Sequence, residues 1–201
     1  IINIYKSYNL KKFILLTGYK NLEIKKFFKK NSKNFSDCEI EIFNTGIHTL
    51  TGSRILKAKK FITEDNFMVT YGDGLSDINI DKLIKFHKKS KNIGTITAVR
   101  PPARFGELLI KSNKITKFNE KIQLNQNWIN GGFFVFKRNF FNLIPKKNTM
   151  LETVPIQNLI KKNTLSAYKH SGYWQCIDNR RDLNSIKELI LNGKMPWIRN
   201  H

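Results

Sequence analysis

Two carboxylates in this 201-residue chain stand directly after apolar segments, where strands are expected to end. Asp73 follows the run 67–71, and Asp178 follows the run 173–177. A pair of carboxylates that converges at one sheet edge forms an oxygen site suited to Mg²⁺, which completes its shell with waters and phosphate oxygens. Each residue also has a simpler interpretation. Asp73 could belong to a tight turn between two glycines, and Asp178 could cap the helix that follows it.

Two further pairs carry groups that suit a sugar phosphate. Glu120 and Lys121 follow a predicted strand, so the carboxylate could accept hydrogen bonds from sugar hydroxyls and the ammonium could pair with a phosphate. A solvated ion pair is the alternative. Asn130 and Gly131 open an Asn-Gly-Gly sequence, which is a hairpin turn signal and also permits close approach of a ligand to the backbone.

A third group, rich in hydroxyls and glycines, precedes a predicted helix and contains Thr49 and Arg54. Hydroxyl and backbone donors with one arginine are suited to holding an anion at the start of a helix. An ordinary helix start is the alternative interpretation here.

These residues need a scaffold of alternating strands and helices. Apolar or alternating runs predict strands at 13–17, 39–43, 67–71, 93–99, 131–136 and 165–170. Helical periodicity predicts helices at 1–8, 22–28, 51–61, 79–87, 151–161 and 182–191. Two short strands, 107–111 and 114–119, form a β insertion joined by a turn at 112–113. The pattern predicts one α/β domain over 1–201 with a mostly parallel mixed sheet, whose ligands lie beyond the carboxyl ends of the strands.

The composition is strongly basic, with 36 Lys and Arg against 15 Asp and Glu and a net charge of +21. Such a charge suggests nucleic acid or an anionic surface. Most of the basic residues are lysines spread along a chain rich in Asn and Ile, which is typical of an AT-rich genome, so we favour codon drift and expect no nucleic-acid partner. No apolar run is long enough to cross a bilayer and two cysteines make no disulfide scaffold, so a cytoplasmic protein without a membrane partner fits best.

Several motifs together resemble one family, the glucose-1-phosphate cytidylyltransferases, which are sugar nucleotidyltransferases. They occur in that family's order and spacing: Thr70–Gly74, Pro101–Gly106, Glu120–Lys121, Trp128–Phe134 and Gly172–Asp178. The resemblance covers nearly the whole chain and implies the Rossmann-like nucleotide-diphospho-sugar transferase fold. It also implies the reaction, in which a phosphate oxygen of glucose 1-phosphate attacks the α-phosphorus of CTP to give CDP-glucose and pyrophosphate.

The same resemblance implies roles for the residues above. Asp73 and Asp178 look like ligands of a Mg²⁺ cofactor, and with Lys121 they form the expected catalytic set. The expected substrate-binding residues are Thr49, Arg54, Gly72, Glu120, Lys121, Asn130 and Gly131. The attacking oxygen is already anionic, so catalysis would be positioning plus charge neutralisation. The histidines need no catalytic role, and His87 is expected in the core.

The chain departs from the family at its start. The family begins with a strand and a Gly-rich loop containing Thr and Arg that wraps the triphosphate, and this sequence, opening at Ile1 without Met, contains neither. Asn44 stands where the family usually has Asp. Since that strand would lie inside the sheet, we expect an N-terminally truncated enzyme that is inactive and poorly stable alone. The resemblance further implies a homo-oligomer whose product feeds dideoxy-sugar synthesis for surface polysaccharide such as O antigen.

Two alternatives remain open. The chain could be a nucleotidyltransferase for another nucleoside triphosphate or another sugar 1-phosphate, because the loop that reads the base is partly missing. It could also be an inactive fragment that binds a sugar phosphate or nucleotide without turnover. The presence of both Asp73 and Asp178 argues against an inactive fragment, because the predicted metal ligands are kept. The missing loop argues for an inactive fragment.

Overall fold

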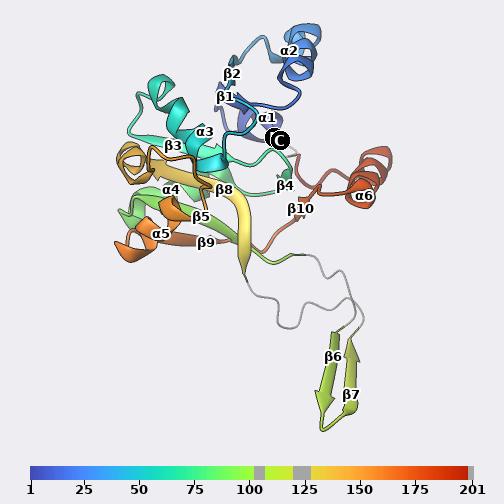
Figure 1. Ribbon diagram of the computed structural model, residues 1–201. Helices are drawn as coiled ribbons and strands as arrows, with labels where there is room; N and C mark the ends of the chain where they lie inside the picture. The colour runs from blue at the N-terminus through green and yellow to red at the C-terminus, as the bar shows by residue number, and fades with distance from the viewer. Residues whose placement is uncertain (102–106, 120–127, 199–201) are drawn as a thin grey trace.

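A computed structural model describes residues 1–101, 107–119 and 128–198 of the chain. Its main sheet has four strands in the order β3 (Asn66–Thr70), β8 (Ile129–Lys137), β5 (Gly94–Val99) and β9 (Leu165–Lys169). β8 runs antiparallel to β3 and β5, and β5 pairs in parallel with β9. Three of the four strands therefore point the same way, and the predicted α/β fold with a mixed sheet is confirmed (Figure 1).

The other strands form three separate pairs. β1 (Lys12–Thr17) runs parallel to β2 (Glu39–Asn44), β4 (Gly74–Ser76) antiparallel to β10 (Trp174–Cys176), and β6 (Glu107–Lys111) antiparallel to β7 (Lys114–Asn119). Within the described ranges, β1 and β2 form no strand pairing with the main sheet. β4 was not predicted, because three residues are too few to show a strand periodicity.

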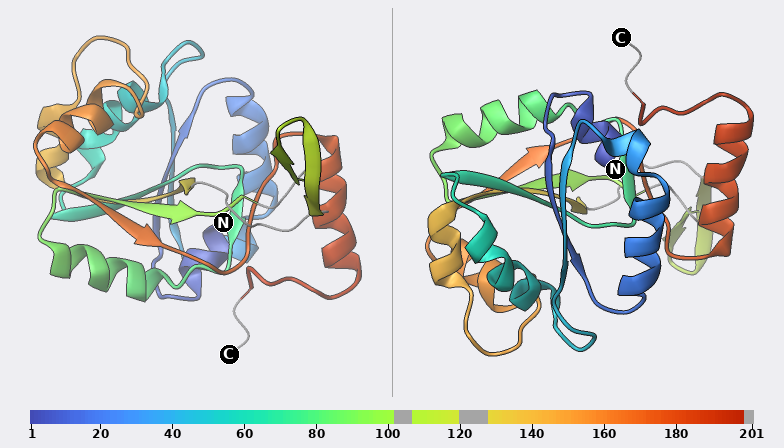
Figure 2. Two further views of the ribbon diagram at one scale, coloured as in Figure 1. Left: turned by 90° about the horizontal axis from the view of Figure 1, so that it is seen from below. Right: turned by 90° about the horizontal axis from the view of Figure 1, so that it is seen from above.

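Helices lie on both faces of the main sheet (Figure 2). One face carries α3 (Thr51–Ala58) and α5 (Val154–Lys161), with the 3₁₀ turns η2 (Lys59–Phe61) and η3 (Arg138–Leu143). The other carries α1 (Ile2–Lys6) and α4 (Ile80–Ser90), while α6 (Arg180–Leu191) stands to one side of the sheet and contributes Ile186 to the same core cluster. α2 (Asn21–Lys30) and η1 (Ser32–Phe35) lie between β1 and β2 in the chain. No helix among the described residues has the length and apolar character that crossing a membrane requires.

β8 supplies the centre of both cores. Phe133 and Val135 point into the cluster shared with α1 and α4, and Phe134 and Phe136 point into the cluster shared with α3 and α5. This division follows from the strand geometry, in which successive side chains point to opposite faces. The three phenylalanines are fully buried, and each contributes on the order of 2–3 kcal/mol of hydrophobic free energy.

Three predicted helix boundaries are corrected by the structure. The helix predicted over 51–61 ends at Ala58 and continues as η2. The helix predicted from Leu151 begins at Val154, because Pro155 suits a first helical turn. The helix predicted from Asp182 begins at Arg180.

His87 is a core residue, as predicted. It is fully buried on α4, with Nδ1 2.8 Å from Oγ1 of Thr95 and Nε2 3.2 Å from Oδ1 of Asn66. Burial lowers the pKa of its imidazole to about 4. The ring is therefore neutral at physiological pH and joins α4 to β5 and β3.

The β6–β7 hairpin is confirmed and lies apart from the sheet (Figure 1). Its turn residues Ser112 and Asn113 have φ of 42° and 66°, the left-handed conformations that a tight two-residue hairpin turn requires. The hairpin exposes large apolar side chains: Leu108, Leu109, Ile110, Ile115 and Phe118.

Candidate active site

The two predicted metal ligands are brought together by the β4–β10 pair. Gly74 lies opposite Cys176 in that pairing, and the amide of Ile177 donates a 2.9 Å hydrogen bond to the carbonyl of Asp73. One carboxylate oxygen each of Asp73 and Asp178 and the sulfur of Cys176 all lie within 4.8 Å of one another. The carboxylates therefore converge at one place although 105 positions separate them in the chain.

The simpler interpretation of Asp178 as a helix cap is wrong. Asn179 occupies the N-cap position of α6, and its Oδ1 accepts a 3.0 Å hydrogen bond from the amide of Asp182. The side chain of Asp182 in turn accepts from the amide of Asp178 at 3.1 Å. Asn179 therefore caps α6, and Asp182 in the first turn of the helix holds the backbone of Asp178.

Asp73 belongs to a tight turn, as the simpler interpretation predicted, and this turn is also part of the candidate metal site. Gly72 and Asp73 form a turn after β3, and both are exposed. A Cβ built on Gly72 would meet nothing within 4 Å. The turn therefore presents the Asp73 carboxylate and open backbone to solvent at the carboxyl end of β3.

A cavity of about 310 Å³ surrounds these carboxylates. It is lined by residues of β4, β8 and β10 and the loops beside them: Tyr71, Asp73, Gly74, Pro101, Ile129, Asn130, Gly131, Gly132, Trp174, Gln175, Cys176 and Asp178. The indole N–H of Trp174 donates a 2.9 Å hydrogen bond to the carbonyl of Gly131. Four predicted site residues, Asp73, Asn130, Gly131 and Asp178, therefore share one cavity.

Asn130 and Gly131 lie inside β8, so their interpretation as a hairpin turn is wrong. Oδ1 of Asn130 accepts a 2.9 Å hydrogen bond from the amide of Gly132, whose φ is +77°. A Cβ on Gly131 would lie 2.7 Å from Cγ1 of Val99. Glycine is required at this position because β5 packs too closely for a side chain, and not because the chain turns there.

The residues Tyr71 and Glu152 were missed by the sequence reasoning. The Tyr71 hydroxyl, which borders the cavity, donates a short hydrogen bond to the Glu152 carboxylate, and Oγ1 of Thr51 lies 3.4 Å from the same carboxylate. Burial, followed by this acceptor, raises the pKa of Tyr71 well above its usual value. One signal was available, because Tyr71 is two positions before Asp73, at the end of the same predicted strand.

Thr49, in the loop after β2, and Arg54, in α3, are not among the residues that line the cavity. The Arg54 guanidinium donates to the carbonyls of Thr17 at 2.8 Å and Ile47 at 3.3 Å, and to the hydroxyl of Thr45. The Thr49 hydroxyl donates to the carbonyl of Thr45 at 2.6 Å. In this structure the Arg54 side chain joins the end of β1 to the loop after β2, and the Thr49 hydroxyl makes a hydrogen bond within that second loop. Glu120 and Lys121 lie outside the described residues.

The donor set fits the Mg²⁺ that the resemblance implies. Asp73 and Asp178 offer exposed carboxylate oxygens, the ligands that Mg²⁺ prefers, with room beside them for water and phosphate oxygens. Cys176 is the third side chain at this position, and its sulfur lies 3.1 Å from Oδ1 of Asp178. Burial, together with the neighbouring carboxylates, raises the pKa of the Cys176 thiol to about 12.

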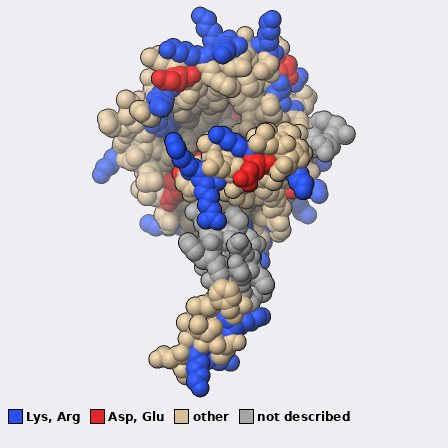
Figure 3. Space-filling model, turned by 90° about the vertical axis from the view of Figure 1, so that its right-hand side faces the viewer, with Lys and Arg blue, Asp and Glu red and all other residues tan. Residues whose placement is uncertain are grey.

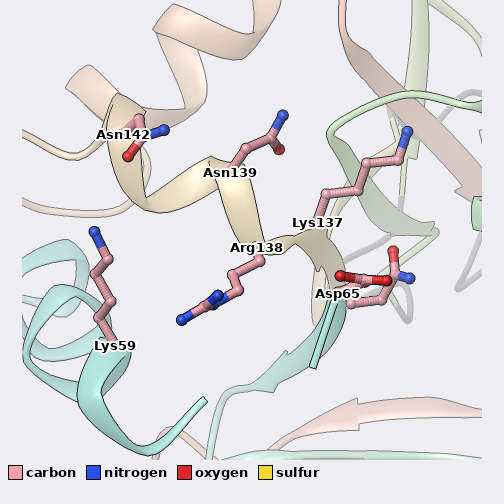
Figure 4. A pocket seen from close by; sticks show the side chains of 7 residues that line it. Lys59, Asp65, Lys137, Arg138, Asn139 and Asn142 are labelled. Atoms are coloured by element: carbon pink, nitrogen blue, oxygen red, sulfur yellow. The ribbon is translucent and has the colours of Figure 1, made fainter. Parts of the chain in front are cut away.

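A larger cavity of about 760 Å³ lies at the opposite ends of β3 and β8. Its lining is mainly amide and cationic: Lys59, Asp65, Asn66, Lys137, Arg138, Asn139 and Asn142 (Figure 4). One carboxylate among seven residues provides no paired oxygen ligands. The smaller cavity is therefore the candidate active site.

The basic side chains on the face in Figure 3 are distributed over separate parts of the surface, with acidic groups between them. A nucleic-acid groove would need a continuous basic stripe with stacking aromatics.

Comparison with known proteins identifies the class. The nucleotidyl transferase family model matches residues 3–193, so the chain belongs to the nucleotidyl transferase family. Solved structures share its fold, among them HddC from Yersinia pseudotuberculosis, with a TM-score of 0.72, 20% identity and coverage of 94% of this chain and 83% of that one. A UDP-glucose pyrophosphorylase complexed with UDP-glucose has a TM-score of 0.69 at 14% identity, covering 96% and 85%. The expected nucleotide-diphospho-sugar transferase fold is confirmed.

Within that family the chain belongs with the glucose-1-phosphate cytidylyltransferases. A probable enzyme of that name from Bacillus subtilis is 36% identical over 98% of this chain and 85% of its own length. The glucose-1-phosphate cytidylyltransferase of Salmonella typhimurium is 33% identical over 98% and 84%.

Proposed function

We propose that this chain carries the nucleotidyl transfer centre for CTP and glucose 1-phosphate, forming CDP-glucose and pyrophosphate. The observation that carries the proposal is the convergence of Asp73 and Asp178 in a cavity open to solvent, in a chain 36% identical to a probable enzyme of that specificity. The reaction joins a phosphate oxygen of the sugar phosphate to the α-phosphorus of CTP and breaks the bond to pyrophosphate.

The chain's own residues would act by positioning. Asp73 and Asp178 would hold Mg²⁺, which when bound neutralises phosphate charge during the transfer. The backbone at Gly72 is open enough for close approach of a ligand, and Asn130 and Gly131 line the cavity. Glu120 and Lys121 would hold the sugar and its phosphate.

Thr49 and Arg54 need a rearrangement to take the nucleotide contacts proposed for them. In this structure the Arg54 guanidinium donates its hydrogen bonds to Thr17, Thr45 and Ile47. A triphosphate oxygen could replace these acceptors at the ends of β1 and β2, because a guanidinium pairs well with phosphate. We also expect a homo-oligomer and a product that feeds surface polysaccharide synthesis.

The direct test is pyrophosphate release with glucose 1-phosphate and Mg²⁺, offering CTP, UTP, dTTP, ATP and GTP separately. We expect preference for CTP. Made in a protein extended through the upstream reading frame, Asp73→Asn should lower kcat/KM by about a hundredfold or more, whereas Asp81→Asn, in the exposed first turn of α4, should leave it near the parent value. Equal kcat/KM values in the two variants would contradict a role for Asp73 in the transfer.

A second arm tests the expected truncation. The same assay is run on a protein extended through the upstream reading frame, because the separation of β1 and β2 from the main sheet is what a missing interior strand would leave. We expect activity in the extended protein and little in the 201-residue chain. Nucleotide binding without turnover in both proteins would favour the inactive binding fragment instead.

A further inference from the structure

The three side chains at the end of the β4–β10 pair differ in chemical softness. Asp73 and Asp178 present hard oxygens, and Cys176 presents a polarisable sulfur. Mg²⁺ binds oxygen ligands, whereas Zn²⁺ and Cd²⁺ gain strongly from a thiolate. Mg²⁺ does not need the sulfur of Cys176. Its position beside the two carboxylates instead gives the site a ligand that Zn²⁺ and Cd²⁺ prefer.

The backbone holds the three donors in position. Cys176 is paired with Gly74, and the carbonyl of Asp73 accepts from Ile177, so all three residues belong to one hydrogen-bonded unit. The side chains of Cys176 and Asp178 lie together, with the sulfur 3.1 Å from Oδ1 of Asp178. The carboxylate of Asp182, in the first turn of α6, accepts from the amide of Asp178 and holds its backbone.

The distances fit a single small ion. Zinc lies about 2.3 Å from sulfur and about 2.0–2.2 Å from carboxylate oxygen, which places tetrahedral ligand atoms about 3.5 Å apart. The sulfur of Cys176 is 3.1 Å from Oδ1 of Asp178, and all three ligand atoms lie within 4.8 Å. The Asp73 side chain is exposed and so has room to turn toward the other two donors, and the cavity beside them has room for water.

We propose that Asp73, Cys176 and Asp178 bind a thiophilic divalent cation of the zinc and cadmium class through two oxygens and one sulfur, in competition with Mg²⁺. The metal–sulfur bond forms as the thiol proton leaves to solvent. This inference rests on the proposed function, because it concerns the same metal site. The site takes Mg²⁺ through its oxygens and is blocked by a soft ion that recruits the thiol.

The test is a titration of the 201-residue protein with cadmium chloride, without nucleotide or sugar phosphate. We expect a thiolate-to-cadmium charge-transfer band in the ultraviolet that saturates at one ion per chain. Cys176→Ser should abolish the band. Cys38→Ser is the matched control and should keep it, because Cys38 lies beside Asp37 and Lys6 in a different part of the fold.

Carboxylate variants distinguish a built site from a reactive surface thiol. Asp178→Asn and Asp73→Asn should each weaken cadmium binding about tenfold or more, while Asp81→Asn should not. Millimolar Mg²⁺ should shift the cadmium midpoint upward. Circular dichroism of each variant checks that it is folded.

Any of four outcomes would overturn the proposal: no band in the parent protein, a band that survives Cys176→Ser, cadmium affinity insensitive to both carboxylate variants, or no competition by Mg²⁺. None of these depends on turnover. If the pyrophosphate assay fails while cadmium binds as expected, the proposed function is rejected and the metal site stands. If transfer is observed and cadmium gives no band, the thiol is excluded and the oxygen site stands.

Discussion

Trp174 donates its indole N–H to the carbonyl of Gly131 at 2.9 Å and so joins β10 to β8 across the candidate active site. This bond connects the pair of short strands that presents the two carboxylates to the strand that forms the centre of both cores. Together with the hydrogen bond from Ile177 to Asp73, it sets the position of Asp178 relative to the main sheet.

Trp174→Phe keeps an aromatic ring and removes the donor. Because the Gly131 carbonyl loses its partner, we expect unfolding free energy to fall by about 1 kcal/mol and kcat/KM for pyrophosphate release to fall more steeply than stability explains. Urea unfolding of the 201-residue chain and the pyrophosphate assay on the upstream-extended protein measure the two effects. Trp197→Phe is the control, since Trp197 packs against Tyr173 in the core and should affect stability alone. Unchanged kcat/KM in Trp174→Phe would contradict the anchoring role.

Two glycines in the site should respond differently to alanine. A Cβ on Gly131 would lie 2.7 Å from Cγ1 of Val99 and 3.1 Å from the carbonyl oxygen of Thr97, so Gly131→Ala should destabilise by about 1–3 kcal/mol. Gly72→Ala has open space around the new methyl and should leave the urea midpoint unchanged. Reduced activity in a fully stable Gly72→Ala protein would support close ligand approach at that position. Equal midpoints for the two variants would mean that β5 and β8 are less tightly packed than described.

Tyr71→Phe tests the hydrogen bond to Glu152. The variant leaves a partly buried carboxylate without its phenol donor, so we expect a loss of about 1–2 kcal/mol in unfolding free energy. Tyr19→Phe is the matched control, because Tyr19 is 73% exposed and its substitution should change stability by less than about 0.5 kcal/mol. Similar effects in both variants would show that the Glu152 contact contributes nothing specific.

His87 should make stability depend on pH. Its folded-state pKa of about 4 lies below the ordinary value of 6.5, so between these values the unfolded chain binds more protons than the folded one. Stability from this group is full above pH 6.5 and falls as pH drops toward 4, by on the order of 2–3 kcal/mol. His87→Gln should flatten that part of the profile in urea titrations between pH 7 and 4. A parent profile with the same slope as the variant would argue against the buried neutral ring.

The fold was largely predictable because its strands are long and apolar. Phe67 to Thr70 and Gly131 to Phe136 have sequence patterns that fix them as buried strands before any partner is known. The separation of β1 and β2 from the main sheet could not be read from local patterns, because pairing depends on contacts between distant segments. The Asn130–Gly131 turn prediction failed for the same reason. Packing against Val99 outweighs the local turn preference there.

The candidate site was half predictable. Asp73 and Asp178 follow strands, and strand ends of an α/β sheet converge, so their meeting follows from general rules. Cys176 lies within the apolar run 173–177 and Tyr71 at the end of the predicted strand 67–71, and neither position by itself predicts that the side chain reaches the cavity. Glu152 was placed inside a helix that in fact begins two residues later, and in its turn conformation it reaches Tyr71 instead.

The β6–β7 hairpin makes the solution behaviour of this protein sensitive to ionic strength. Ile115 and Phe118 are each 61% exposed, on a molecule that carries a net charge of +21. In dilute buffer, long-range repulsion keeps copies apart. At about 0.15 M salt the Debye length contracts to about 8 Å, so the charge repulsion between two copies is screened. The attraction between their exposed apolar hairpin side chains then outweighs that repulsion. Colloidal stability should therefore decrease as salt is added, the reverse of the salting-in expected when opposite charges attract.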